Sequence, residues 1–484
     1  MNVRLLCLVA GLFVLVTLPA GAAVSEKSTP LDLNQYLNQV RGKNLSFKGS
    51  QAGSEGSEMR SEESVLLFAP TVYSNFQFTS DQKLPLIPVF TYDEQNTTNF
   101  TLGVSQQTTF GLLAKISYNV FYNNYINLQI PGAGGSPPGA SSYYITTPML
   151  ELSQSLWSNS FGSGNRANRD LLEAQALASS YSSRYVAKAT LVQAESAYWR
   201  LAADRQTITA EKQALDRAQK LYDLSLRRAK LQLADQADAL QAEAALDLRK
   251  LDMQSALDEE RSASRAFNMV RNLDSDVVEE NVMELSPEQM DHLSLPEKAE
   301  LRDDVKAARE SARAAVANSL VADQRDRPQL DIFGSFALNG HTGDFSSSLG
   351  DPFSAHRPTE SVGLRFQAPL DIGALGRARA GWKLEQTSAE LSFQQKVLDQ
   401  DQNWKDLTQK LDESKRRLTL VRKLETAQDS KLKHERDRLS KGRTTTYQVL
   451  LFEEDFASSQ IARIRAQLEV LNVYTQMKLF GEKL

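Results

Sequence analysis

The sequence predicts a mixed α and β membrane protein, in which a transmembrane antiparallel β-barrel is shared between copies of the chain and continues into long helices. Three observations support this fold class. Several segments of strand length alternate apolar and polar residues, which is the two-residue period of a β-strand. Two stretches read as helices of roughly 65 residues, about 100 Å long, which is far longer than the helices of a compact domain. The same order of elements also occurs twice along the chain.

The amino terminus has the three parts of a secretory signal peptide, which we predict over residues 1–23. A basic start at Arg4 precedes an apolar run from Leu5 to Leu18, and small residues follow at Ala20–Ala23. A single-pass membrane anchor is the alternative, but this run is shorter than the ~20 residues that span a bilayer. No later stretch reaches ~18 uninterrupted apolar residues, so we expect no transmembrane helix.

The first half of the mature chain, residues 24–273, is predicted to contain a helix, four strands and two long helices. Leu33, Leu37 and Val40 have helical spacing, although the glycines that follow weaken this first helix. The strands are predicted from alternation, and the long helices from proline-free stretches rich in good helix formers. The predicted elements are a helix at 31–67, strands at 69–80, 99–108, 112–125 and 143–157, a loop at 131–142, and helices at 166–231 and 235–272.

The second half, residues 274–484, repeats this order with fewer strands. Its last helix carries apolar residues a heptad apart, which is the pattern of a seam against a partner helix; they are Leu450, Ala457, Ile464 and Leu471. The predicted elements are a helix at 295–325, strands at 328–339 and 359–370 joined by a loop at 340–358, and helices at 377–440 and 444–482.

The two halves align at a spacing of roughly 210 residues in their later parts, which indicates an internal duplication. Gly164–Ala167 corresponds to Gly376–Arg379, and Asp238–Glu243 corresponds to Gln448–Glu453. The main asymmetry is an additional pair of strands in the first half, from Phe100 to Tyr122.

The strands have features of an outer-membrane barrel. Aromatic residues lie near their ends, as in the girdles of such barrels, and their length suits a tilted crossing of ~9–11 residues. A sheet in lipid must close, because no edge can stay unpaired there. The six predicted strands are fewer than the eight of the smallest common barrels, so the chain must oligomerise. A soluble β-sandwich is the alternative for the strands taken alone.

Composition and motifs argue against several other functions. The 484 residues carry a net charge of −5 and no dominant basic patch, so we expect no nucleic-acid partner. Cys7, the only cysteine, would leave with the signal peptide. The histidines are His292, His341, His356 and His434, and they show no metal-ligand spacing. No catalytic constellation is present either. We therefore expect no metal site, no cofactor and no enzymatic activity such as that of a secreted hydrolase. The acidic run Glu453–Asp455 is interpreted as a solvated helix face.

Four motifs, in this duplicated order, resemble the TolC family of outer-membrane efflux proteins over nearly the whole mature chain. They are the strand openings Ala69–Val72 and Arg327–Leu330, the segment Leu152–Trp157 before a helix, and the tip Lys441–Gly442 followed by Val449–Leu450. The resemblance implies a homotrimer whose β-barrel crosses outer-membrane lipid and whose α-helical barrel crosses the periplasm. It also implies a passive export duct of a tripartite efflux pump or type I secretion system. Its expected partners are a periplasmic adaptor and an inner-membrane transporter.

The sequence departs from the family pattern of four strands per subunit and twelve per trimer. Its extra hairpin, residues 99–125, predicts six strands per subunit and eighteen in all. We expect this hairpin to enter the barrel, and a folded flap is the alternative. A structure in which Leu102 and Ile116 do not pair with neighbouring strands would contradict this expectation.

The helix breaks are the candidate functional sites. The resemblance makes these breaks the periplasmic tips and places the adaptor there, so we expect contact through Leu231, Gln232, Lys441, Gly442 and Arg443. Repeated around a threefold axis, Asp235 and Asp238 would place acidic groups at the entrance and favour cations. The alternative is that these aspartates cap a helix. At the second tip the family often has aspartates, whereas the corresponding entrance positions here are Gln448 and Leu451.

The alternative from a different class of protein is a soluble periplasmic coiled-coil adaptor or scaffold. Adaptors also contain helical hairpins, but they lack two blocks of strands with alternating apolar residues. The sequence therefore favours the duct over the adaptor.

Overall fold

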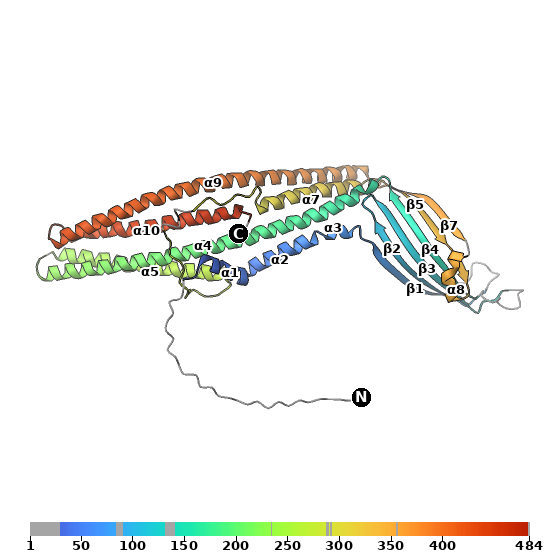
Figure 1. Ribbon diagram of the computed structural model, residues 1–484, viewed down its shortest axis with the longest axis horizontal. Coiled ribbons are helices and arrows are strands. Elements are labelled where there is room, and N and C mark those ends of the chain that lie inside the picture. Colours follow the sequence, from blue (N-terminus) through green and yellow to red (C-terminus); the bar gives the residue numbers. More distant parts are fainter. Residues whose placement is uncertain are drawn as a thin grey trace, which may run out of the picture.

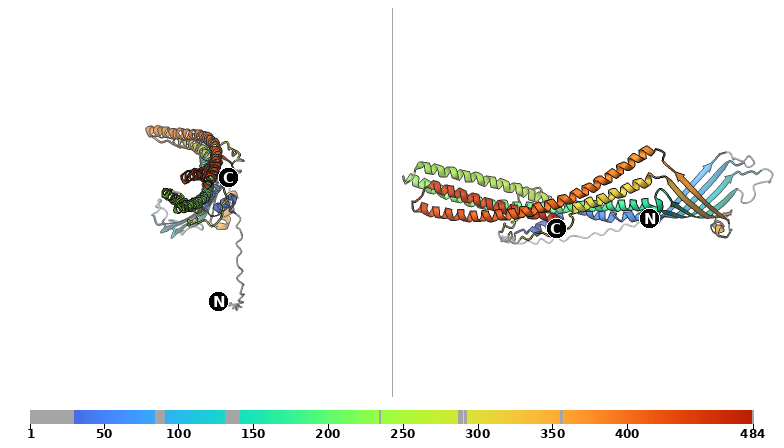
Figure 2. Two further views of the ribbon diagram at one scale, coloured as in Figure 1. Left: turned by 90° about the vertical axis from the view of Figure 1, so that its left-hand side faces the viewer. Right: turned by 90° about the horizontal axis from the view of Figure 1, so that it is seen from above.

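The computed structural model describes residues 30–83, 91–130, 141–233, 235–286, 290, 293–354 and 357–482. The expected signal peptide and most of the expected loop at 131–142 lie outside these residues. The molecule is elongated, with a helical body that leads into a β-sheet at one end (Figure 1). Viewed along its length, the helices follow a curved arc instead of forming a closed bundle (Figure 2).

The sheet is antiparallel and has the order β1-β2-β3-β4-β5-β7, with the short β6 paired to β4. Its strands are β1 (Thr71–Asp81), β2 (Glu94–Gln107), β3 (Leu112–Ile126), β4 (Ser142–Ser155), β5 (Gln329–Leu338), β6 (Gly340–Thr342) and β7 (Pro358–Gln367).

The extra hairpin is an integral part of this sheet. Leu102 in β2 pairs with Ser74 in β1, and Ile116 in β3 pairs with Leu150 in β4. The two residues named in the sequence-based test therefore both pair with neighbouring strands. The hairpin is therefore part of the sheet and is not a folded flap, while its place in a closed barrel stays a prediction.

Two long helical hairpins form most of the body. The first consists of α4 (Ser163–Lys230, 68 residues) and α5 (Gln236–Val270, 35 residues). The second consists of α9 (Ile372–Ser440, 69 residues) and α10 (Thr446–Met477, 32 residues), and a 3-10 turn, η2 (Lys478–Phe480), follows it. Close to the sheet, α7 (Asp303–Arg325) lies between α4 and α9. Within the described residues no helix is both long and apolar enough to cross a membrane.

The expected helix at 31–67 is wrong, because three helices occupy this region. They are α1 (Leu33–Lys43), α2 (Leu45–Arg60) and α3 (Glu63–Leu66). The first break lies at Asn44, whose extended backbone allows its side chain to accept a hydrogen bond from Phe47 N (2.7 Å) and donate one to Val270 O (2.7 Å). The glycines that follow this break do not interrupt the helix, since they lie inside α2.

Two further boundaries differ from expectation. The helix expected at 295–325 begins only at Asp303, because the preceding backbone bonds to other elements: Ala299 N donates to Phe480 O (2.8 Å) and Arg302 N donates to Gln400 Oε1 (2.6 Å). The expected loop at 340–358 contains β6 and a helix, α8 (Phe345–Ser354).

The core lies in the middle of the body, where α1 and the chain after α5 pack around the hairpins. The rings of Tyr36 and Phe267 stack with centroids 4.1 Å apart, and Tyr198 donates a hydrogen bond to Leu31 O (2.6 Å). Of the predicted heptad stripe in α10, Ala457, Ile464 and Leu471 are buried. The seam predicted from their spacing is confirmed. This core holds the tips and the sheet at opposite ends of the molecule.

Candidate functional site

One face of the sheet is apolar and exposed. The strand register places the exposed apolar side chains of the sheet on this one face, because paired residues of neighbouring strands point in the same direction. A water-soluble monomer rarely exposes so many apolar side chains on one face. The exposed residues of this apolar face are Val72, Phe76, Phe78, Phe100, Leu102, Val104, Ile116, Leu150, Leu152, Ile332, Phe336, Val362, Leu364 and Phe366.

The opposite face of the sheet is mainly polar. Lys115 in β3 forms an ion pair with Glu151 in β4 (3.5 Å), and Thr101 Oγ1 donates a hydrogen bond to Asn119 Oδ1 (3.3 Å). Side chains of this kind suit contact with water, whereas the apolar face does not. The sheet therefore has the two-sided character of a barrel wall.

The two outer strands of the sheet each have one free edge. Among the described residues, β1 pairs only with β2 and β7 pairs only with β5. Each free edge presents backbone N–H and C=O groups without partners in the sheet. The sheet is thus open at both edges.

The predicted tip residues lie together at the end of the body farthest from the sheet (Figure 1). Leu231 is the C-cap residue after α4 and Lys441 the one after α9, and the reversals place Gln232 and Gly442 at φ 56° and 70°. All four are exposed, as is Arg443. Contact of these residues with an adaptor remains a prediction.

The predicted entrance residues begin the returning helices. Asp235 caps α5, because its side chain accepts a hydrogen bond from Ala237 N (3.1 Å). Asp238 lies in the first turn, where a negative charge suits the helix dipole. Gln448 and Leu451 lie at the start of α10. The capping role of Asp235 is therefore observed, while a role of its charge at an entrance remains a prediction.

A set of charged contacts between the two hairpins was not anticipated. Glu453 in α10 lies 2.9 Å from Arg217 in α4 and also bonds Arg436 in α9. Its neighbour Glu454 pairs with the buried side chain of Arg249 in α5. We call these five residues the latch. The interpretation of Glu453 as part of a solvated face is wrong, since only 9% of it is exposed.

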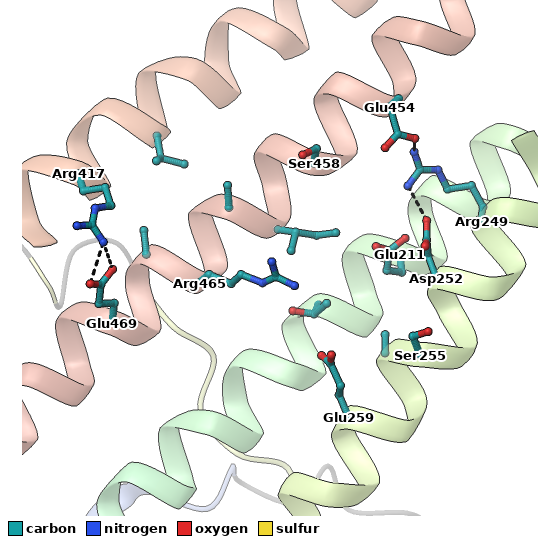
Figure 3. A pocket seen from close by; sticks show the side chains of 16 residues that line it. Glu211, Arg249, Asp252, Ser255, Glu259, Arg417, Glu454, Ser458, Arg465 and Glu469 are labelled. Atoms are coloured by element: carbon teal, nitrogen blue, oxygen red, sulfur yellow. Dashed lines mark hydrogen bonds and ion pairs between the residues drawn. The ribbon is translucent and has the colours of Figure 1, made fainter.

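A cavity of about 580 Å³ lies between the hairpins beside the latch (Figure 3). Glu211 of α4 is buried at its wall, and burial raises the pKa of this carboxyl. Across the cavity, Arg417 of α9 and Glu469 of α10 form an ion pair of 2.6 Å. Beside this cavity the hairpins are joined by the latch, and on either side of it by buried apolar side chains, such as Leu221 of α4 against Val449 of α10.

The described residues contain no group of three side chains suited to hold a metal ion. His341 and His434 lie far apart in sequence and belong to different parts of the fold, at β6 and in α9. His292 and His356 lie outside the described residues.

Comparison with known proteins identifies the fold. No family model and no curated protein matches the sequence. Among solved structures, the outer-membrane channel OprN is 16% identical, with a TM-score of 0.63 over 93% of this chain and 90% of that chain. VceC of Vibrio cholerae is 14% identical (TM-score 0.64; 93% of this chain, 96% of that chain), and the open MtrE channel of Neisseria gonorrhoeae is 16% identical (TM-score 0.64; 93% and 89%). The fold is that of the TolC-like outer-membrane channels, as the sequence motifs predicted. OprN and MtrE are outer-membrane channels, and VceC is an outer-membrane protein.

Proposed function

We propose that this chain, which has a TolC-like fold, is one subunit of a homotrimeric export duct in the bacterial outer membrane. The shared barrel would cross the outer membrane, and the helices would form a barrel through the periplasm. The duct itself is passive, with an inner-membrane transporter supplying energy and a periplasmic adaptor joining the two. It serves a tripartite efflux pump or a type I secretion system.

The free edges of β1 and β7, on a sheet with an exposed apolar face, are the observation that carries this proposal. Lipid offers no hydrogen bonds, so a sheet with two free edges cannot stay open in a bilayer. With six strands on the main path, β1 and β7 run in opposite directions. The β7 strand of one copy can therefore pair with β1 of the next in antiparallel register. Three copies give eighteen strands.

The helical body supports the same arrangement. In α9, which lies at one margin of the arc (Figure 2), Leu384, Leu391 and Leu398 are exposed at heptad spacing. A heptad stripe of this kind packs against a partner helix. We infer that the partner helix belongs to a neighbouring copy. The closely matched lengths of α4 and α9 also fit two structural repeats, spanning residues 24–273 and 274–484.

A periplasmic adaptor or scaffold is the competing function. A soluble protein of that class gains nothing from fourteen exposed apolar residues on one sheet face. Planar-bilayer recording of the detergent-purified mature protein separates the two functions. Stepwise, long-lived conductance supports the duct, whereas a protein that stays soluble without detergent and never conducts contradicts it.

A further inference from the structure

Helix α8 packs against the apolar face of the sheet, near the end remote from the helical body (Figure 1). Tyr118 Oη donates a hydrogen bond to the carbonyl oxygen of Leu349 (2.7 Å), and Thr146 Oγ1 donates one to that of Ser348 (2.5 Å). Strand register places Tyr118 and Thr146 on the same face as Ile116. The helix therefore lies on the apolar side of the sheet, opposite the polar face.

The helix is itself two-sided. Ser348 and Pro352 are buried toward the sheet. Beside them, Phe345, Leu349 and Phe353 follow one another at four-residue spacing and form a stripe along the helix. Their exposed fractions are 50%, 41% and 61%. Among the described residues, this stripe has little cover from the rest of the chain.

The stripe continues the apolar face of the sheet. Tyr118, which bonds the backbone of Leu349, lies in β3 between Ile116 and Val120 on the same face. Toward the remote end, the rings of Tyr122 and Tyr144 lie 4.6 Å apart, and Phe345 lies 5.5 Å from Tyr144. Tyrosines collect at the boundary between acyl chains and water. The helix thus spans the transition from the apolar face to this boundary.

We propose that α8 is an interfacial helix whose stripe inserts among the acyl chains of the outer leaflet. This inference rests on the proposed function, in which the apolar face meets lipid. A neighbouring copy is a poorer occupant, because copies join at the free edges of β1 and β7, whereas α8 packs on β4 and β6. Amphipathic helices lying in the interface bury their apolar side about 5–10 Å into the headgroup and acyl boundary.

Site-directed fluorescence quenching tests the inference. The mature chain is expected to lack cysteine, so single cysteines can be introduced as Leu349→Cys, Ser347→Cys and Ile116→Cys. Each is labelled with an environment-sensitive dye and reconstituted in phosphatidylcholine vesicles whose acyl chains carry bromine at a shallow depth. Ser347 is the matched control, because it is exposed and its position two residues before Leu349 places it on the other side of a helix with 3.6 residues per turn. Ile116 reports on the apolar face of the sheet itself.

The inference predicts severalfold stronger quenching at Leu349→Cys than at Ser347→Cys, together with quenching at Ile116→Cys. Quenching at Ile116→Cys without quenching at Leu349→Cys overturns the role of α8 and leaves the proposed duct standing. Equal quenching at Leu349→Cys and Ser347→Cys overturns the oriented insertion. If Ile116→Cys is not quenched either, both the inference and the membrane placement of the sheet fail. Cross-linking of Leu349→Cys to a second copy would identify a protein neighbour as the occupant instead.

Discussion

The guanidinium of Arg217 in α4 lies 2.9 Å from the carboxylate of Glu453 in α10, and this contact joins the first hairpin to the second. Glu453 also bonds Arg436, so one mostly buried carboxylate faces two cations. Removing one partner of a buried ion pair is costly, because the remaining charge is left without compensation. The latch is therefore expected to hold the two hairpins together near the tips.

Replacing Glu453 with Gln is predicted to lower the free energy of unfolding by roughly 3 kcal/mol per subunit, as for other buried pairs. In the proposed duct the hairpins would also separate more readily, so the open probability in planar bilayers should rise. The matched control is Asp455→Asn, which removes a partner from the half-exposed Lys431–Asp455 pair. Such surface pairs contribute about 0–1 kcal/mol. Equal effects of the two substitutions would show that the latch has no special role.

The pH dependence of stability is predicted to include a contribution from Asp204 in α4. Burial raises the pKa of this carboxyl from 3.8 to about 6, despite the nearby Arg200. The folded protein then binds the proton more tightly than the unfolded chain. The free energy of unfolding should therefore fall as pH rises from about 4 to 6, by on the order of 2–3 kcal/mol per subunit, and change little above this range.

Asp204→Asn should remove this contribution. The variant is expected to be more stable than the parent at pH 8 and equally stable below about pH 4, where both side chains are neutral. Urea unfolding followed by circular dichroism at several pH values measures the difference. A stability difference that does not change with pH would contradict a raised pKa.

Gly103 in β2 is predicted to be essential for the β1–β2 contact. A Cβ atom at this position would lie 2.5 Å from the ring of Tyr73 in β1. Gly103→Val should displace this ring and weaken the pairing, which lowers the temperature at which oligomers dissociate on gels. Gly343→Ala is the control, because nothing lies within 4 Å of its added Cβ. A normal dissociation temperature for Gly103→Val would contradict the observed packing.

The charge of the first tip is predicted to affect ion selectivity. Asn is as good a helix cap as Asp, so Asp235→Asn preserves the cap while removing the negative charge. The double substitution of Asp235 and Asp238 with Asn should lower cation selectivity in single-channel recordings. Unchanged reversal potentials would mean that these residues only support the start of α5.

Local patterns predicted the strands and long helices well. The strand expected at 112–125 is β3 (Leu112–Ile126), because alternation along one strand records which face each residue occupies. The break at Asn44 was missed because it depends on a bond to Val270, far away in sequence. The same holds for the latch, which joins residues of four different helices.

Helix α8 was missed for a different reason. Its ten residues include four serines, a glycine and a proline, a composition typical of loops. Only the four-residue spacing of Phe345, Leu349 and Phe353 indicated a helix, and this signal is short. The tips were located correctly by their helix breaks, although the sequence could not decide between capping and an entrance role for Asp235.

In the proposed duct β1 of one copy pairs with β7 of the next, and disulfide trapping in membranes tests this pairing most directly. Asn75→Cys in β1 is combined in turn with Thr359→Cys, Ser361→Cys or Arg365→Cys in β7, all on the polar face. Only cysteines with Cα atoms roughly 4.4–6.8 Å apart can form a disulfide, so the correct register should react selectively. We predict covalent dimers and trimers, with nothing larger. Exclusively monomeric protein in all three combinations, or a ladder extending beyond the trimer, would contradict a barrel shared by three copies.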